Sequence, residues 1–304
     1  MSFEIAERAA PTVHEYSGTE LKRVAERMPS RVAGPQAMSG TLQRFTSLTW
    51  MLAYLDFKLK FFGSILGYAW QLVKPLAMFS VLFFVFTEVV PLGDGVPYYG
   101  VVLLSGIVLM SFFTESTTGA IGSVLGAEGL IRKISFPIMA IPLASVTSVF
   151  LTLFLNYGVV MLFAVAAGVS PMLSWIQIVP LLFLLYLVAA SVSVALSAYY
   201  VRFRDVQPIW EVIAQVLFYA SPVIYPISFV QERSETLAKL MMCNPVAAII
   251  EQMRHAAIDS SAPSTVDVLG SWWLLAIPMG IVVLLAAFGY TSMKRLAPMV
   301  AEEM

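Results

Sequence analysis

No charged residue occurs between Ile134 and Val201. A helix needs about 20 predominantly apolar residues to cross the roughly 30 Å hydrocarbon core of a membrane, so this stretch is too long for a single crossing. Within it, the sequence from Gly168 to Pro171 (Gly-Val-Ser-Pro) supplies a turn that divides the stretch into two helices. The stretch therefore predicts a chain built around membrane-spanning helices.

The composition supports this prediction and excludes several classes of protein. Of the 304 residues, 59% are hydrophobic and only 12% are charged, with a mean hydropathy of +0.82, whereas soluble domains carry about 25% charged residues. This composition argues against a water-soluble enzyme. The single Cys243 allows no internal disulfide, and the two histidines, His14 and His255, form no zinc-binding cluster. The net charge of -1 indicates no nucleic-acid partner.

Six apolar segments are candidates for membrane crossing. Helices are expected rather than a barrel, because a helix satisfies every backbone polar group within its own segment. The predicted fold is therefore an all-α integral membrane protein. The six segments are Leu76 to Val90, Val96 to Thr114, Ile138 to Ala167, Trp175 to Tyr200, Val212 to Ser228 and Trp272 to Tyr290.

The fifth and first segments have the weakest boundaries. Pro222 and Pro226 are expected to break or kink the outer half of the fifth, because proline lacks the amide hydrogen that a helix needs. The first is short and carries Lys74 and Glu88 near its ends.

The basic residues predict the orientation of the chain. An even number of crossings puts both termini on one side, and that side then holds all but three of the 18 Lys and Arg residues; the exceptions are Arg233, Lys239 and Arg254. Basic residues that flank membrane helices are retained in the cytoplasm, so both termini are predicted to be cytoplasmic and the protein to lie in the plasma membrane.

The chain is divided accordingly. We expect a cytoplasmic tail over residues 1–44, an amphipathic interface helix over 45–70, a six-span domain over 71–293 and a cytoplasmic tail over 294–304. In the second of these regions, aromatic rings recur at helical spacing, which suits the headgroup level of a membrane. The alternative is a helix packed against its own bundle.

The large outer segment, residues 230–270, lies between the last two crossings. Asn244-Pro245 begins a short apolar run that is too short to span, followed by Glu251, Arg254 and His255 at helical spacing. A re-entrant or surface helix fits this pattern. It could act as a gate or as a plain extracellular cap.

The chain offers little for covalent chemistry. It contains no G-x-x-x-x-G-K-[ST] phosphate loop, so no ATP or other cofactor is expected to bind to it. Glu88, Glu115 and Glu211 each lie near the end of a predicted crossing, where an ionised carboxylate costs less than at the centre. An anchoring role is favoured for them over a proton relay.

Several short motifs follow one another in a fixed order. They are Phe57-Lys58-Leu59-Lys60, Gly63-Ser64-Ile65-Leu66-Gly67-Tyr68-Ala69-Trp70, Lys74-Pro75-Leu76, Arg132-Lys133-Ile134-Ser135-Phe136-Pro137, Tyr200-Val201-Arg202-Phe203-Arg204-Asp205-Val206, Ser221-Pro222-Val223-Ile224-Tyr225-Pro226 and Asn244-Pro245. Together they resemble the ABC-transporter permeases that export O-antigen, capsule, teichoic acid or mycobacterial galactan. The resemblance covers nearly all of the chain beyond its N-terminal tail.

This resemblance implies partners and site residues. Such permeases are homodimers that work with two separate ATPase subunits, which bind the ATP and Mg²⁺. The implied interface helix contains Trp50, Tyr54, Lys58, Lys60 and Trp70. The implied coupling loop to the ATPase contains Glu128, Arg132, Lys133 and Phe136, although Arg132 and Lys133 also suit a simple positive-inside anchor. The implied outer gate contains Pro222, Pro226, Asn244 and Arg254.

By the same resemblance, the first and fifth crossings face the translocation path. A sugar chain has apolar ring faces that aromatic side chains can accept, so an aromatic wall is expected there. The alternative is that these rings pack against lipid or neighbouring helices. The candidates are Phe79, Phe83, Phe86, Phe218, Tyr219 and Tyr225.

The sequence thus predicts a permease subunit of an ATP-driven exporter of a polyprenyl-linked polysaccharide, with cell-wall galactan as the preferred cargo. Its expected partners are an ATPase, a second copy of itself, the lipid-linked glycan and membrane lipids. A membrane-embedded transferase and a proton-coupled flippase remain as alternatives. The transferase lacks an Asp-x-Asp or histidine constellation, and the flippase would depend on Glu88 or Glu115.

Overall fold

The computed structural model describes residues 41–61, 67–90, 93, 95–131 and 137–303, and the regular elements in these ranges are all helical. The chain divides into two units, residues 1–44 and 45–304, and apart from residues 41–44 the described elements belong to the second. The elements are α2 (Thr41–Phe61), α3 (Gly67–Phe84), the π-helix η2 (Val85–Val89), α4 (Tyr99–Ile121), α5 (Ser123–Gly126), α6 (Glu128–Ile131), α7 (Ala140–Ala166), the 3-10 helix η3 (Leu173–Gln177), α8 (Ile178–Arg202), α9 (Val206–Ala220), α10 (Ile227–Arg233), α11 (Glu235–Met242), α12 (Pro245–Ala257), α13 (Thr265–Leu269), the 3-10 helix η4 (Trp272–Leu275) and α14 (Ala276–Glu303).

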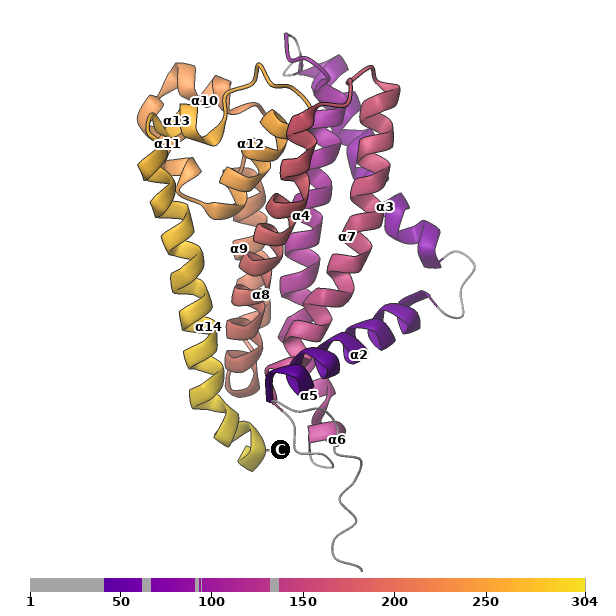
Figure 1. Ribbon diagram of the computed structural model, residues 1–304, viewed down its shortest axis with the longest axis vertical. Helices are drawn as coiled ribbons and strands as arrows, with labels where there is room; N and C mark the ends of the chain where they lie inside the picture. Colours follow the sequence, from indigo (N-terminus) through magenta and orange to yellow (C-terminus); the bar gives the residue numbers. More distant parts are fainter. Residues whose placement is uncertain (1–40, 62–66, 91–92, 94, 132–136, 304) are drawn as a thin grey trace, which may run out of the picture. The chain divides into compact units, whose positions relative to one another are not determined.

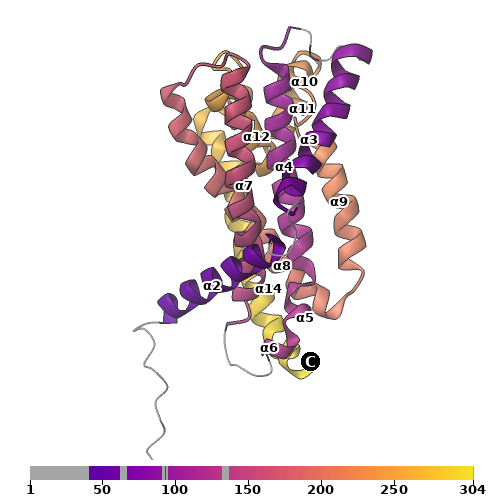
Figure 2. The same cartoon turned by 90° about the vertical axis from the view of Figure 1, so that its right-hand side faces the viewer.

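Five helices in the described ranges are long and apolar enough to cross a membrane. They are Ala69–Val89, Tyr99–Ile121, Ala140–Ala166, Leu173–Arg202 and Trp272–Arg295. These five correspond to five of the six segments expected from the sequence. Their long axes run in broadly the same direction in both views of the molecule (Figures 1 and 2).

The core of the bundle is organised around α4. This helix packs against α3, α7, α8, α9 and α12, and most of its side chains are buried. Leu103, Ile107 and Leu109 on α4 have no exposed surface. The last helix, α14, joins the bundle through α8. By contrast, α3 has no buried residue in its spanning window, which leaves it on the surface of a single copy of the chain.

The turn predicted at Gly168 is confirmed. Helix α7 ends at Ala166, and Gly168 has a left-handed backbone with φ of +95°. The amide of Gly168 donates to the carbonyl of Val165, and the amide of Val169 donates to that of Ala164. This pair of hydrogen bonds is the Schellman arrangement, in which glycine avoids the steric cost of the left-handed region.

The fifth predicted crossing differs from the expectation, because its helix stops early. Helix α9 has 15 residues, which reach only about 22 Å at 1.5 Å per residue. The residue before Pro222 is Ser221, which is extended with φ of −105° and ψ of 151°, as the residue before a proline prefers. The predicted break at Pro222 and Pro226 is therefore confirmed, and the six long helices expected from the sequence are not found in the described ranges: α9 is followed by the short helices α10 to α13 at the upper end of Figure 1.

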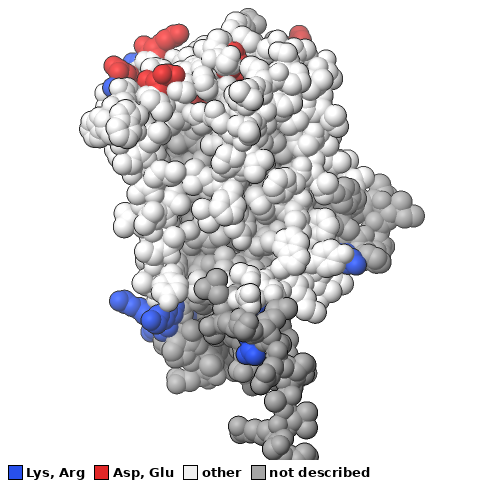
Figure 3. Space-filling view, in the orientation of Figure 1, with Lys and Arg blue, Asp and Glu red and all other residues white. Residues whose placement is uncertain are grey.

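Charged side chains gather at the two ends of the molecule. On the face shown in Figure 3, Lys and Arg lie mainly at the lower end and Asp and Glu at the upper end, and the surface between them is uncharged. The long apolar helices cross this uncharged band. The distribution is that expected of a protein whose middle lies in lipid.

Candidate functional site

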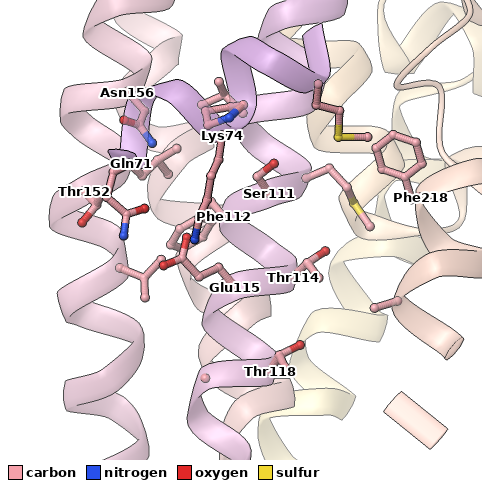
Figure 4. Close-up of a pocket in the computed structure, with 18 of the residues that line it drawn as sticks. Gln71, Lys74, Ser111, Phe112, Thr114, Glu115, Thr118, Thr152, Asn156 and Phe218 are labelled. Carbon is pink, nitrogen blue, oxygen red and sulfur yellow. The ribbon is translucent and has the colours of Figure 1, made fainter. Parts of the chain in front are cut away.

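A pocket of about 760 Å³ opens among α3, α4, α7 and α9 (Figure 4). Many of its lining residues are polar, although all four helices are predominantly apolar. The polar residues are Gln71, Lys74, Ser111, Thr114, Glu115, Thr118, Thr152, Asn156, Glu211 and Gln215. Polar side chains at membrane depth are costly unless they face protein or water, and they mark functional pathways. The pocket is therefore the candidate functional site.

Helical spacing places these polar side chains on one face of each helix. On α4 they occur at Ser111, Thr114, Glu115 and Thr118, each of which is three or four residues from two of the others. The same spacing separates Glu211 from Gln215 on α9, and Gln71 from Lys74 on α3. The predictions from the sequence do not include this face, although polar residues three or four apart within the apolar segments are a signal that could have revealed it.

Two of the carboxylates lie elsewhere than expected. The sequence predicts Glu115 near the end of a crossing, but α4 continues to Ile121, so this residue lies inside the helix and lines the pocket. Glu211 likewise lies within α9. Each carboxylate is tolerated because it faces the pocket rather than the apolar neighbours of its helix. Glu88 lies in η2 and is not among the described residues that line the pocket.

The two carboxylates of the pocket have different neighbours. Figure 4 shows the side chain of Lys74 extending from α3 toward the carboxylate of Glu115 on α4. Glu211 instead accepts a hydrogen bond from the side-chain amide of Gln207, one turn earlier on its own helix, at 3.1 Å. A lysine thus faces one carboxylate, and a neutral amide contacts the other.

Helix α9 is fixed against α4 by one buried side chain. The indole nitrogen of Trp210 donates to the hydroxyl of Thr117 at 3.0 Å, and the Trp210 ring meets that of Phe113 edge to face, with centroids 6.2 Å apart. Ala214, one turn later, is also buried. These contacts hold one wall of the pocket in place.

The aromatic residues expected to form a wall do not all lie together. Of that set, Phe218 and Tyr219, both from α9, line the pocket. Phe79 stacks on Phe83 at 5.3 Å and meets Phe163 of α7 at 5.9 Å, and Phe86 also packs against the hydrophobic core. None of these three residues is among the described residues that line the pocket, Phe83 is exposed, and a place for them on the translocation path stays a prediction.

The last candidate of that set, Tyr225, lies in the break after α9. Its hydroxyl donates to the carbonyl of Tyr219 at 2.9 Å, so it closes the end of α9 by contacting the unpaired backbone there. Tyr99, at the start of α4, donates to the carbonyl of Ile224 at 2.8 Å in the same way. The broken segment is thus tied to the bundle through its backbone.

Several residues of the expected gate meet next to this break. Asn244 caps α12 by accepting from the amide of Val246 at 3.0 Å, and its side-chain amide donates to the hydroxyl of Ser221 at 3.2 Å. Pro222 and Pro226 are both buried close to Ser221 in the chain. The structure therefore links the start of α12 to the end of α9, and the role of these residues as a gate stays a prediction.

Arg254, the remaining gate residue, lies further along α12 in a buried ion pair. Its guanidinium lies 3.8 Å from a carboxylate oxygen of Glu251, whose exposed fraction is 0%. Neither oxygen of Glu251 accepts a hydrogen bond from the described residues. Burial raises the pKa of Glu251 to about 7, although Arg254 opposes the rise. Helix α12 is not among the five long apolar helices, and it packs against α4, α8 and α14.

The expected interface helix is divided in the structure. Helix α2 contains Trp50, Tyr54, Lys58 and Lys60, and it runs crosswise to the long helices in Figures 1 and 2. Its Trp50 and Tyr54 rings are exposed, and Lys58 lies over the Tyr54 ring at 4.8 Å. Trp70 belongs to α3 instead, because α2 ends at Phe61.

The expected coupling loop is described only in part. Glu128 begins the short helix α6. Arg132, Lys133 and Phe136 lie outside the described residues.

Comparison with known proteins identifies the family of the chain. Residues 47–258 match the family model described as ABC-2 type transporter. The O-antigen export system permease protein RfbA of Klebsiella pneumoniae is 28% identical over 207 residues, which are 68% of this chain and 78% of the relative. The protein of the same name from Myxococcus xanthus is 25% identical over 224 residues, which are 73% of this chain and 84% of the relative.

These matches confirm the resemblance that the sequence motifs indicated. Together with the apolar helices, they make this chain a multi-pass membrane transport protein, and they place it with transport subunits rather than with enzymes. The chain belongs to the ABC-2 type transporter family, in which a permease works with a partner ATPase subunit.

Proposed function

We propose that this chain is the permease subunit of an ATP-driven exporter that moves a polyprenyl-linked polysaccharide from the cytoplasmic to the outer side of the plasma membrane. The observation that carries the proposal is the polar pocket inside an apolar bundle. The names of the relatives, which are O-antigen export permeases, support polysaccharide as the class of cargo. Cell-wall galactan is the cargo that we favour.

The chemistry of the pocket suits a sugar chain. Serine, threonine, asparagine and glutamine side chains both donate and accept hydrogen bonds, as sugar hydroxyls do. Phe112, Phe218 and Tyr219 add aromatic surface to the same lining, which can contact the apolar faces of sugar rings. The pocket therefore offers both kinds of contact without fixing one sugar sequence.

We assign ATP binding and hydrolysis to separate subunits. ATP and Mg²⁺ are proposed to bind to two copies of a partner ATPase, because this sequence has no phosphate loop. We propose a homodimer, in which α3 and α9 of one copy face those of the other. The exposed surface of α3, the exposed side of α9 and the pocket that both helices line support this arrangement.

Both termini are proposed to be cytoplasmic. The basic lower end in Figure 3 supports this orientation by the positive-inside rule. The ATPase would then contact the loop that contains Glu128, Arg132, Lys133 and Phe136. Binding of ATP by the partner would shift the permease between closed and open states.

Transport in reconstituted vesicles tests the proposal. We expect a polyprenyl-linked galactan to become accessible on the far side of the membrane only when the permease, the ATPase and ATP are all present. An ATPase partner with its phosphate-loop lysine replaced should abolish this transport. Transport that continues without ATP hydrolysis and collapses with a proton ionophore would support a proton-coupled flippase instead.

Charge reversal tests the coupling loop. Replacing Arg132 and Lys133 together by glutamate should release the ATPase from the membrane fraction and reduce transport at least tenfold, because the loop would then present the wrong charge to its partner. The same reversal at Lys294 and Arg295, which are exposed on α14, serves as the control. Equal retention of the ATPase by both variants, measured by co-purification, would contradict the assigned contact.

A further inference from the structure

The charges that line the pocket are unbalanced. Among the described lining residues, Lys74 is the one cation, and Glu115 and Glu211 are the anions. One positive and two negative groups give a formal charge of −1. A site built to hold an acidic polymer would show the opposite balance, because carboxylates and phosphates are bound most strongly by Arg and Lys.

The position of Lys74 bears on how much of this negative charge a cargo would meet. Figure 4 shows that its side chain extends toward Glu115, so the charge of the lysine is directed at a group of the protein. Among the described ion pairs, however, none includes Glu115 or Glu211, and the carboxylate of Glu211 accepts a hydrogen bond from the neutral Gln207. Two carboxylates against one lysine therefore leave a net negative charge in the pocket, to which both Glu115 and Glu211 contribute.

This negative charge is accessible to a cargo. Glu115 and Glu211 are both exposed in a single copy of the chain, so a group that enters the pocket meets their carboxylates directly. A second copy of the chain would bring the same residues and hence the same sign of charge. A cargo with an anionic group on every sugar would be repelled repeatedly as it passed.

The rest of the polar lining is neutral. It consists of hydroxyl and amide groups, each of which can donate or accept a hydrogen bond. Such groups match an uncharged sugar and discriminate little among its stereoisomers. The neutral residues are Gln71, Ser111, Thr114, Thr118, Thr152, Asn156 and Gln215.

We infer that the pocket selects glycans whose repeating sugars are uncharged and rejects those that carry a carboxylate or phosphate on each repeat, with Glu211 and Glu115 as the residues that determine this specificity. This inference rests on the proposed function, since it names the class of polysaccharide that the same pocket admits. It separates uncharged galactan-type or O-antigen-type cargo from teichoic or uronic-acid polymers.

A binding experiment tests the inference without depending on transport. Ser111, which Figure 4 shows in the pocket, is replaced by cysteine in a Cys243→Ala background, and the permease–ATPase complex is placed in lipid nanodiscs. The rate at which the neutral reagent N-ethylmaleimide modifies the new cysteine is then measured. The probes are a galactose hexasaccharide and a galacturonic acid hexasaccharide of the same linkage, which differ by one carboxylate per sugar.

We expect the neutral hexasaccharide to slow modification at least fivefold at a concentration at which the acidic one slows it less than twofold. Replacing Glu115 and Glu211 by glutamine should raise protection by the acidic sugar to within twofold of that by the neutral sugar. Glu232→Gln, the same change at an exposed residue of α10 outside the pocket, should preserve the original difference.

Three outcomes would overturn the inference: protection by the acidic sugar equal to or greater than that by the neutral one, protection by neither, or a difference that the double glutamine variant leaves unchanged. The vesicle assay described above decides the proposed function separately. ATP-dependent export of a glycan together with any of these three results would refute the charge selection and leave the exporter assignment standing.

Discussion

Arg254→Ala is expected to lower the free energy of unfolding by about 3 to 5 kcal/mol, the range found when one partner of a buried ion pair is removed. The change leaves Glu251, whose exposed fraction is 0%, on a packed helix without its cation. Its two carboxylate oxygens already receive no hydrogen bond from the described residues, so nothing else there compensates for the loss. Thermal or denaturant unfolding of the purified protein at pH 8 measures the effect.

A second ion pair in the same outer segment provides the control. Lys239 and Glu235 on α11 lie 2.8 Å apart, but both are exposed to solvent. Lys239→Ala should therefore change stability far less than Arg254→Ala, since exposed pairs contribute little. Replacing Glu251 by glutamine in the Arg254→Ala background should restore part of the loss. Equal effects of the two single alanine substitutions would show that burial of the α12 pair has no energetic consequence.

The same pair gives stability a defined dependence on pH. The pKa of Glu251 is about 7 in the folded protein, above its ordinary value of 4.5. The folded state therefore holds this proton more tightly than the unfolded state does. The contribution of Glu251 to the free energy of unfolding is fully present below pH 4.5 and is lost as the pH rises through 7. Glu251→Gln should remove this pH-dependent contribution from unfolding curves measured across that range.

Gly289→Leu is expected to lower the free energy of unfolding by about 3 kcal/mol, the upper end of typical overpacking costs. A Cβ atom at Gly289 would lie 2.6 Å from the backbone carbonyl oxygen of Ser191 and 3.5 Å from the backbone nitrogen of Ala195. These are backbone atoms of α8 and cannot rotate away, so α14 would have to move. Small residues permit such close approach between membrane helices.

The matched control for this substitution is on the same helix. A Cβ atom at Gly280 of α14 would meet nothing within 4 Å, so Gly280→Leu should be tolerated. The midpoint of thermal unfolding in detergent compares the two variants. If both lower the midpoint equally, the loss comes from leucine in this helix in general and not from the contact with α8.

Some features of this protein follow from local properties of the chain. The long apolar segments predict membrane helices because the cost of burying charge in lipid acts on each segment separately. Gly168 and Pro222 act on the backbone next to them, and the turn and the end of α9 are found as expected. The short motifs likewise indicate the family, because each of them is a run of adjacent residues.

Other features depend on residues that are distant in the sequence. The pocket combines Gln71, Ser111, Thr152 and Glu211 from four helices, and no local pattern shows that their polar faces meet. The sequence predicts the end of a crossing at Thr114 because a charged residue follows it, whereas α4 continues because Glu115 faces the pocket.

Whether a side chain is buried likewise depends on helices that are distant in the sequence. The expected charged face of α12 is realised by Glu251 and Arg254, but these residues are buried rather than on a surface. The sequence by itself determined the five long apolar helices and the breaks at Gly168 and Pro222, since hydropathy and proline or glycine geometry act within a few turns. Only the tertiary structure decided which faces meet, because the environment of a side chain is set by the helices packed around it.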